Sequence, residues 1–300
     1  MKSGMSELRF PAAFRADAAL IMCAFFWGLG FVAMKDALSA YPAHWLLFFR
    51  FGGGALLMGS FFFKRCVQIT RADFLGGIVM GIFLFLGMGT QTLGLNYTTA
   101  GKQAFLTATY VIMVPFLVWG LDRVFPGWIS VAGSIVCFAG MGLLTSDAAE
   151  PLNRGDVLTV ISAAFFAAQI VATARCASSG DPLALTFVEF CVTAVLALCG
   201  ALLFEGPLVP RGTQGLLAIG FSTFFCTFLC FLVQNVAQKY APPVHASIFL
   251  GLESVFGLLG GVVLLGEVFT FTMGAGCALI FAAILLVELF PVLTAWGQCG

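Results

Sequence analysis

Identical residues recur along this chain at a constant separation of 143 positions. The pairs are Gln91 and Gln234, Tyr97 and Tyr240, Gly77 and Gly220, and Gly133 and Gly276. The chain therefore consists of two copies of one half, each long enough for about five membrane spans. An odd number of spans makes the second copy begin on the opposite side of the bilayer. The two halves are then inverted about a pseudo-two-fold axis in the membrane plane.

The amino-acid composition indicates a membrane protein. Apolar residues make up 61% and charged residues 9% of the 300 positions, and mean hydropathy is +1.05. A soluble domain carries about 25% charged residues. The formal net charge is zero, which gives nucleic-acid binding no electrostatic support. The ten cysteines are scattered, mostly within apolar runs, and we interpret them as small apolar side chains rather than metal or redox ligands.

Ten apolar segments each approach the ~20 residues needed to cross a bilayer core. They run roughly over 17–35, 44–63, 74–95, 100–121, 128–145, 156–175, 183–203, 214–237, 244–265 and 270–290. The segments predict an all-α integral membrane protein of ten transmembrane helices in two inverted five-helix repeats. The expected divisions are a cytoplasmic N-terminal segment at 1–15, a first repeat at 16–146, an outer linker at 147–155, a second repeat at 156–291 and a cytoplasmic tail at 292–300.

Lys and Arg residues are distributed unevenly between the two sides of this topology. With a cytoplasmic N-terminus, nine fall inside and four outside, and Arg50 lies within a span. The inner set is Lys2, Arg9, Arg15, Lys64, Arg65, Arg71, Arg123, Arg175 and Lys239, and the outer set is Lys35, Lys102, Arg154 and Arg211. This excess predicts a multi-pass protein of the plasma (inner) membrane with both termini cytoplasmic. We expect the first span to stay uncleaved, because no small-residue cleavage site with a soluble domain follows it.

Short motifs occur in matching order in the two halves. They are Phe26-Trp27-Gly28-Leu29-Gly30 in the first span, Arg50-Phe51 in the second, Gly101-Lys102-Gln103-Ala104-Phe105 and Pro115 in the fourth, and Leu252-Glu253-Ser254 with Gly266-Glu267 in the ninth. In order, spacing and duplication, the chain resembles the EamA-type branch of the drug/metabolite transporter superfamily. The resemblance covers nearly the whole chain, about residues 16–290.

The resemblance implies a ten-helix bundle without a nucleotide or metal cofactor. It also implies a central cavity lined mainly by the first, third and fourth helices of each half, with the fifth helices more peripheral. Family members move small metabolites or amphipathic compounds, commonly outward, driven by gradients. The ninth span departs from the family, since Glu253 is followed by Ser254 where proline is usual. Loss of that proline restores a backbone donor and weakens the case for a kink there.

Glu253 is the sharpest functional candidate among the charged residues within spans. It lies about ten residues from either end of its span, close to the bilayer midplane. A carboxylate is costly to keep charged at that depth, so Glu253 could carry a proton. The alternative is a hydrogen-bonded glutamate that fixes helix packing, and the sequence leaves both open.

Arg50 and Glu189 occupy nearly equivalent places in the second helix of each half, about 9–10 Å inside the helix end. Inversion separates them across the membrane, so we do not expect them to pair. Arg50 is interpreted as a structural residue that reaches water or bonds carbonyl groups. Glu189 could be an acid of the cavity or of the packing.

Lys102 and His245 are repeat partners that both open the fourth helix of their half. We expect them at opposite mouths of the pathway, where a cation could attract an anionic or zwitterionic substrate, or merely reach water. The remaining candidates for the cavity wall share a polar or amphipathic side chain within the predicted lining helices. They are Trp27, Gln91, Thr107, Tyr110, Gln169, Gln234 and Ser247.

Two function classes remain after these observations. The favoured class is a secondary transporter that moves a small molecule, with export as the expected direction and protons as a candidate coupling ion. The other is a membrane-embedded non-transporter, either a lipid-handling enzyme or a structural subunit. An enzyme should cluster its acids or histidines at one interface, whereas here they are dispersed. The Gly101-Lys102-Gln103 segment lacks the glycine spacing and Ser/Thr of a phosphate loop. We expect no enzyme activity and no cofactor; a monomer is compatible with the sequence.

Overall fold

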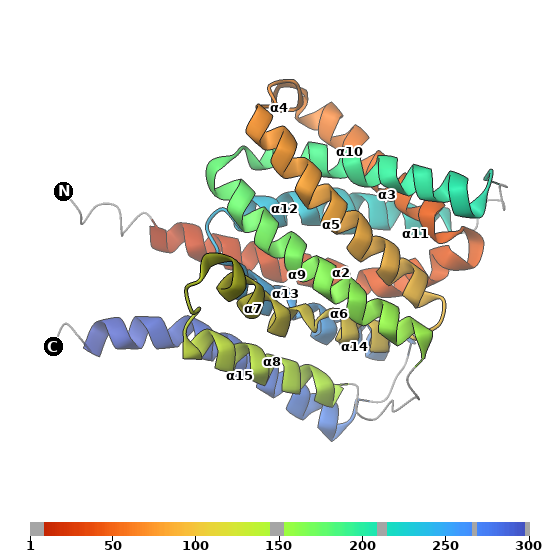
Figure 1. The fold of residues 1–300 in the computed structure, drawn as a ribbon. Helices are drawn as coiled ribbons and strands as arrows, with labels where there is room; N and C mark the ends of the chain where they lie inside the picture. Colours follow the sequence, from red (N-terminus) through yellow and green to blue (C-terminus); the bar gives the residue numbers. More distant parts are fainter. Residues whose placement is uncertain (1–8, 145–152, 209–214, 266–268, 298–300) are drawn as a thin grey trace.

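The structure is a computed structural model that describes residues 9–144, 153–208, 215–265 and 269–297. Every regular element in these ranges is helical (Figure 1). The first half contains α2 (Arg9–Ala40), α3 (Ala43–Phe61), α4 (Phe63–Val67), α5 (Arg71–Leu95), α6 (Ala100–Thr107), α7 (Tyr110–Asp122) and α8 (Trp128–Leu144). The second contains α9 (Arg154–Ser179), α10 (Pro182–Gly200), η2 (Ala201–Glu205), α11 (Leu216–Phe221), η3 (Ser222–Leu229), α12 (Cys230–Ala237), α13 (Pro243–Leu250), α14 (Glu253–Leu265) and α15 (Phe271–Gly297).

Many of these helices are long and apolar enough to cross a bilayer. Seven such stretches meet both conditions among the described residues: Phe14–Ala40, Arg71–Leu95, Ala100–Asp122, Arg154–Ser179, Pro182–Glu205, Leu216–Ala237 and Pro243–Gly260. Two shorter apolar helices accompany them, Trp128–Leu143 and Phe271–Val287. The chain is therefore a multi-pass membrane protein, while the expected count of ten spans stays a prediction. Most of the expected linker, 147–155, lies outside the described residues.

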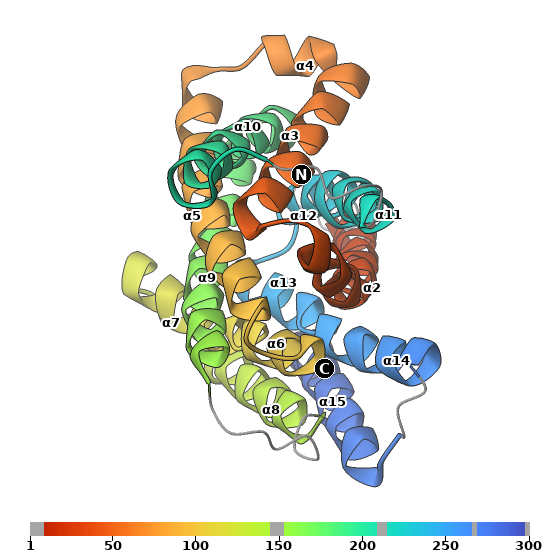
Figure 2. The same cartoon turned by 90° about the vertical axis from the view of Figure 1, so that its right-hand side faces the viewer.

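The helices of the two halves run in opposite directions. α2 starts at the left-hand end of the bundle in Figure 1, whereas α9, the first helix of the second half, starts at the right-hand end. The last described helix, α15, ends on the side where α2 starts. Figure 2 shows α8 and α15 side by side at one edge of the bundle, far from α3 and α10.

Side-chain caps fix where several helices begin. Thr70 and Asp73 form a reciprocal capping box at the start of α5, and Asn153 and Asp156 form one at the start of α9. Each box satisfies amide groups that would otherwise be left open at a helix N-terminus. The Asp73 carboxylate also accepts the amide of Asp181 at 3.0 Å, so the start of α5 is tied to the start of α10.

Glycines allow the closest helix crossings. A Cβ atom on Gly77 or Gly81 of α5 would lie 2.5 or 2.7 Å from the Cβ of Val188 or Val192 on α10. A Cβ atom on Gly28 of α2 would lie 2.7 Å from the Glu253 carbonyl oxygen on α14. Small residues permit such approach of helix backbones within a membrane, where packing rather than hydrophobic burial holds helices together. These crossings bring the two halves into direct contact.

The fourth helix of each half is interrupted at the same repeat position. Ala108 and Thr109 separate α6 from α7, and Gly251 and Leu252 separate α13 from α14. The second pair lies 143 positions after the first, which is the repeat spacing. Gly251 lies against Val111, with an added Cβ only 3.1 Å from a methyl carbon of that valine. The two interruptions therefore face each other across the interface between the halves.

The helix of the ninth span is interrupted although Ser254 stands where proline is usual in the family. The Ser254 amide donates to the Gly251 carbonyl at 3.2 Å, and its hydroxyl donates to the same oxygen at 2.8 Å. The amide and the hydroxyl of Ser254 thus both bond the carbonyl three residues earlier. This is the tighter 3₁₀-type pattern rather than the α-helical bond to the residue four positions earlier. A hydroxyl that competes for backbone carbonyls interrupts the helix without proline.

We expect Gly81→Ala to lower the stability of the protein, because its new methyl group would overlap Val192 and the Glu189 carbonyl oxygen. Overpacking of this kind costs about 1–3 kcal/mol, which thermal unfolding of the detergent-solubilised protein would reveal. Gly89→Ala on the same helix is the control, since nothing lies within 4 Å of its Cβ. Equal unfolding temperatures for the two variants would contradict the close α5–α10 crossing.

Candidate functional site

A cavity of about 60 Å³ lies where the two halves meet. Its wall comes from α2, α3, α5, α6 and α7 of the first half and from α9, η3, α12, α13 and α14 of the second. The volume corresponds to a few water molecules, since each needs at least roughly 10–15 Å³ on this measure. A larger molecule can enter only if helices move apart.

The structure brings together seven of the eight residues that the sequence assigned to the cavity. The wall includes Trp27, Gln91, Thr107, Tyr110, Gln169, Gln234 and Glu253. Ser247 is fully buried but does not line the cavity, because its hydroxyl donates to the Val244 carbonyl at 2.7 Å within α13. The sequence indicated the right helix for this serine but not which way it faces.

Tyr110 and Glu253 form a hydrogen bond between equivalent positions of the two repeats. The Tyr110 hydroxyl donates to Glu253 Oε1 at 3.2 Å, and the residues are 143 positions apart. Each is the first residue of the helix that follows an interruption, α7 for the tyrosine and α14 for the glutamate. Their side chains are only 3% and 4% exposed. This bond therefore lies where the two broken helices face each other.

Trp27 and Gln91 are oriented by hydrogen bonds as well as by packing. The Trp27 indole N–H donates to the Cys226 carbonyl at 2.8 Å. That carbonyl belongs to η3, a π-helical segment, and such segments often occur at functional sites. The Trp27 ring packs on Phe231 with centroids 5.0 Å apart. The Gln91 amide donates to the Thr107 hydroxyl at 3.0 Å, which joins α5 to α6.

A network of amide side chains extends from the cavity into the second half. Gln234 Nε2 donates to Gln169 Oε1 at 3.3 Å and to Gln238 Oε1 at 2.9 Å. Gln169 Nε2 donates to Glu189 Oε1 at 2.9 Å, and Asn235 Nδ2 donates to Glu189 Oε2 at 2.7 Å. Glu189 is therefore a fully buried carboxylate held by two amide donors. It lies behind the cavity wall rather than in it.

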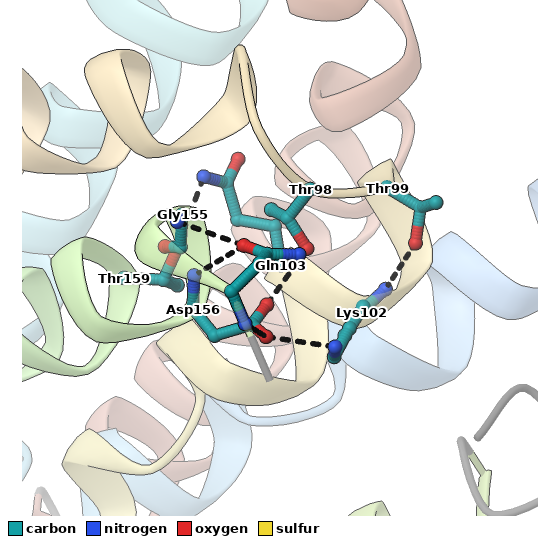
Figure 3. Close-up of polar contacts among 8 residues, drawn as sticks. Thr98, Thr99, Lys102, Gln103, Gly155, Asp156 and Thr159 are labelled. Carbon is teal, nitrogen blue, oxygen red and sulfur yellow. Dashed lines mark hydrogen bonds and ion pairs between the residues drawn. The ribbon is translucent and has the colours of Figure 1, made fainter. Parts of the chain in front are cut away.

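Lys102 forms an ion pair at one end of the bundle. Its ammonium group lies 2.7 Å from Asp156 Oδ2, and the Thr98 hydroxyl donates to Asp156 Oδ1 at 2.9 Å (Figure 3). Gln103, in the same cluster, donates to the Thr159 hydroxyl at 3.3 Å. These contacts join the start of α6 in the first half to the start of α9 in the second. They lie at the right-hand end of the bundle in Figure 1.

His245 forms the equivalent pair at the other end. Its Nδ1 lies 3.6 Å from Asp17 Oδ1, which joins the start of α13 to the first turns of α2. Both of these helices begin at the left-hand end of the bundle in Figure 1. Lys102 and His245, repeat partners in the sequence, thus each pair with an aspartate near the start of the opposite half's first helix. Their pairing follows the pseudo-two-fold relation.

Sequence reasoning missed three polar members of the wall, Arg50, Thr92 and Gln103. Arg50 was interpreted as structural, although a cation inside an apolar run was itself a signal. Gln103 is fully buried, and its Oε1, like that of Gln234, receives no hydrogen bond from the described residues. Within the described ranges no three His, Cys, Asp or Glu side chains converge to hold a metal ion.

The fold and this cavity define a class: a polytopic helical membrane protein with a cavity of mixed polar and apolar lining between two oppositely oriented halves. The chain belongs to the EamA-like transporter family, which matches residues 14–146 and 153–289 and is part of the drug/metabolite transporter superfamily. It is 31% identical over 278 residues to an uncharacterized transporter of Archaeoglobus fulgidus, covering 91% of this chain and 86% of that protein. A protein of known crystal structure shares the fold, with a TM-score of 0.76 at 17% identity over 92% of this chain and 96% of the other.

We expect Lys102→Gln to increase access to the cavity from the end of the bundle where Lys102 pairs with Asp156. Asp156 keeps its bonds to Thr98 and to the Asn153 amide, so the variant should fold. If the ion pair stabilises the conformation in which this end is closed by about 1 kcal/mol, its removal raises the population of the conformation open at this end roughly fivefold. The reaction rate of a small maleimide with Cys226, which lines the cavity, measures this opening.

The reporter protein would retain Cys226 as its single cysteine, and Lys64→Gln at an exposed position provides the matched control. An unchanged rate of Cys226 modification in folded Lys102→Gln protein would show that the ion pair does not hold this end closed.

Proposed function

We propose that this protein is a secondary transporter that moves a small metabolite or amphipathic compound across the plasma membrane by alternating access. Ten transmembrane helices in two inverted five-helix repeats would surround the central cavity, with both termini cytoplasmic. Export is the proposed direction. The family match to both halves, at 14–146 and 153–289, supports the duplication. The opposite directions of α2 and α9 support the inversion.

The observation that carries the proposal is the Tyr110–Glu253 bond inside a cavity lined by both halves. Secondary transporters built from inverted repeats place their binding site at the repeat interface, where discontinuous helices meet. Here two discontinuous helices meet through residues at the same repeat position. A site shared by both halves becomes accessible first from one side of the membrane and then from the other when one half rocks against the other.

The two end pairs support alternation between two closed ends. Lys102–Asp156 and His245–Asp17 each connect one half to the other, at opposite ends of the bundle. Breaking one pair while keeping the other would open the cavity to one side alone.

The wall suits a ligand with both apolar and polar parts. Aromatic and sulfur-containing side chains alternate with amides around it, among them Phe31, Met34, Met88, Phe166 and Phe231. The unsatisfied oxygens of Gln103 and Gln234 can accept hydrogen bonds from a ligand. A proteoliposome assay with amino acids and aromatic amphiphiles, with and without a pH gradient, tests the function. Absence of any flux together with hydrolysis of lipid would instead favour a membrane-embedded enzyme.

The topology predicts that Arg154→Cys is accessible from outside the cell. Arg154 is exposed at the start of α9, on the end of the bundle away from the start of α2. In a cysteine-depleted variant, a membrane-impermeant maleimide should label this position in intact cells. Lys64→Cys, exposed in α4, should react only after permeabilisation. The reverse pattern would place the termini outside.

For coupling, Glu253→Gln should abolish substrate accumulation driven by a pH gradient while preserving substrate exchange. Glutamine mimics the protonated acid and can still accept the Tyr110 hydroxyl, so the cavity keeps its shape but loses the proton site. Exchange needs the cavity and no net proton movement. Counterflow and gradient-driven uptake in proteoliposomes, measured side by side, separate the two activities.

Glu189→Gln is the matched control for this experiment. Glu189 is also a fully buried acid, but it lies outside the cavity wall. Asn235 Oδ1 accepts no hydrogen bond from the described residues, so a rotated Asn235 amide could accept from the new glutamine. Accumulation should therefore persist in Glu189→Gln. Loss of accumulation in Glu189→Gln, with normal accumulation in Glu253→Gln, would move the proton site to Glu189.

A further inference from the structure

Arg50 is a buried cation in the cavity wall. Its side chain, on α3, belongs to a residue only 4% exposed. Its Nε donates to the Thr227 hydroxyl at 3.1 Å. Its Nη1 approaches the sulfur atoms of Met34 at 3.2 Å and Met88 at 4.0 Å. Its guanidinium carbon lies 5.7 Å from the centroid of the Phe51 ring.

This guanidinium has few good hydrogen-bond acceptors. It carries five N–H donors and stays charged at any physiological pH. Thioether sulfur is a weak acceptor, so the Thr227 hydroxyl is the one strong acceptor within the described part of the chain. No described carboxylate lies within ion-pairing distance of Arg50, and its Nη2 bonds no described atom. Buried charges in proteins are ordinarily paired, and no described residue provides the negative charge for Arg50.

Other cations near the cavity are already engaged. Lys35 donates to the Leu95 and Thr98 carbonyls at 2.6 and 2.9 Å, and Lys102 pairs with Asp156. Among the described residues of the wall, Arg50 is the one cation and Glu253 the one acid. Glu253 accepts from Tyr110 rather than from Arg50. A negatively charged ligand in the cavity therefore has a single cationic partner available.

We propose that Arg50 binds a carboxylate group of the transported molecule through Nη1 and Nη2. The planar guanidinium matches a carboxylate through two parallel hydrogen bonds. A single cation, with an acid in the same wall, suits one negative charge better than a phosphate dianion. The apolar surface of Trp27, Phe166 and Phe231 suits an apolar body attached to that carboxylate. This inference rests on the proposed transport function for its biological meaning, but the binding itself does not require transport.

The test compares three probes of similar size on the full-length protein in detergent: 3-phenylpropionate, its neutral amide and phenyl phosphate. Calorimetric titration would measure their affinities for the wild type, Arg50→Gln and Arg50→Lys. We expect Arg50→Gln to bind 3-phenylpropionate roughly 10- to 100-fold more weakly, with the amide unaffected. Arg50→Lys keeps the positive charge but cannot form the bidentate pair with a carboxylate, so its affinity for 3-phenylpropionate should fall by an intermediate amount.

Thermal unfolding of the ligand-free variants separates binding from packing. An unpaired buried cation does not favour the folded state, so Arg50→Gln should keep or raise the midpoint of the wild type. Arg65→Gln, at an exposed arginine paired with Asp181, is the control and should leave all three affinities unchanged. A lower midpoint for Arg50→Gln with unchanged affinity for 3-phenylpropionate would make Arg50 a packing residue and overturn the proposal.

Further outcomes decide which chemical class of ligand binds and distinguish a failure of the binding proposal from a failure of the transport proposal. Stronger Arg50-dependent binding of phenyl phosphate than of 3-phenylpropionate would overturn the carboxylate assignment, as would absence of carboxylate binding by the wild type at millimolar concentration. Arg50-dependent carboxylate binding without flux of any probe in proteoliposomes would support this site and contradict the proposed function. Flux of the amide and carboxylate alike, insensitive to Arg50→Gln, would support transport and contradict this site.

Discussion

Two helices are interrupted in the middle of this protein, and the hydrocarbon core of a membrane permits that only under one condition. Irregular backbone at membrane depth must be buried in protein or line a cavity, because lipid offers no hydrogen bonds. The interruptions after α6 and α13 meet this condition by facing each other, with Gly251 against Val111 and Tyr110 bonded to Glu253. Tyr110 and Glu253, which meet at the interruptions, both line the cavity.

The charged residues fall into two groups with different environments. Near the ends of the bundle they are paired across the halves, as in Lys102–Asp156 and His245–Asp17. Toward the centre, Arg50 and Glu253 line the same cavity without pairing with each other. Paired charges at the ends can hold alternative closed states. Arg50 and Glu253 in the wall remain available to a ligand or a proton. This separation supports the proposal that the pairs at the ends control access to the cavity while the cavity itself binds the substrate.

Hydrophobicity and repeat spacing predicted the helical membrane fold, and the resemblance to the EamA-type family implied which helices line the cavity. Seven of the eight assigned wall residues line it, because polar side chains within apolar spans avoid lipid and so face the interior of the bundle. The same rule does not say which interior space a side chain meets. Ser247 and Glu189 also avoid lipid, yet the first bonds its own helix and the second bonds Gln169 and Asn235 behind the wall.

The sequence by itself determined the duplication, the membrane setting and the family, because these follow from repeat spacing, composition and short motifs, which need no knowledge of contacts. Only the tertiary structure decided which charges have partners. No described carboxylate pairs with Arg50, although α10, which packs against its helix, carries Glu189. The Ser254 hydroxyl bonds the Gly251 carbonyl at the interruption between α13 and α14. Such facts depend on distances between residues far apart in the chain or on the local choice of a hydrogen-bond partner, and neither is encoded in residue type alone.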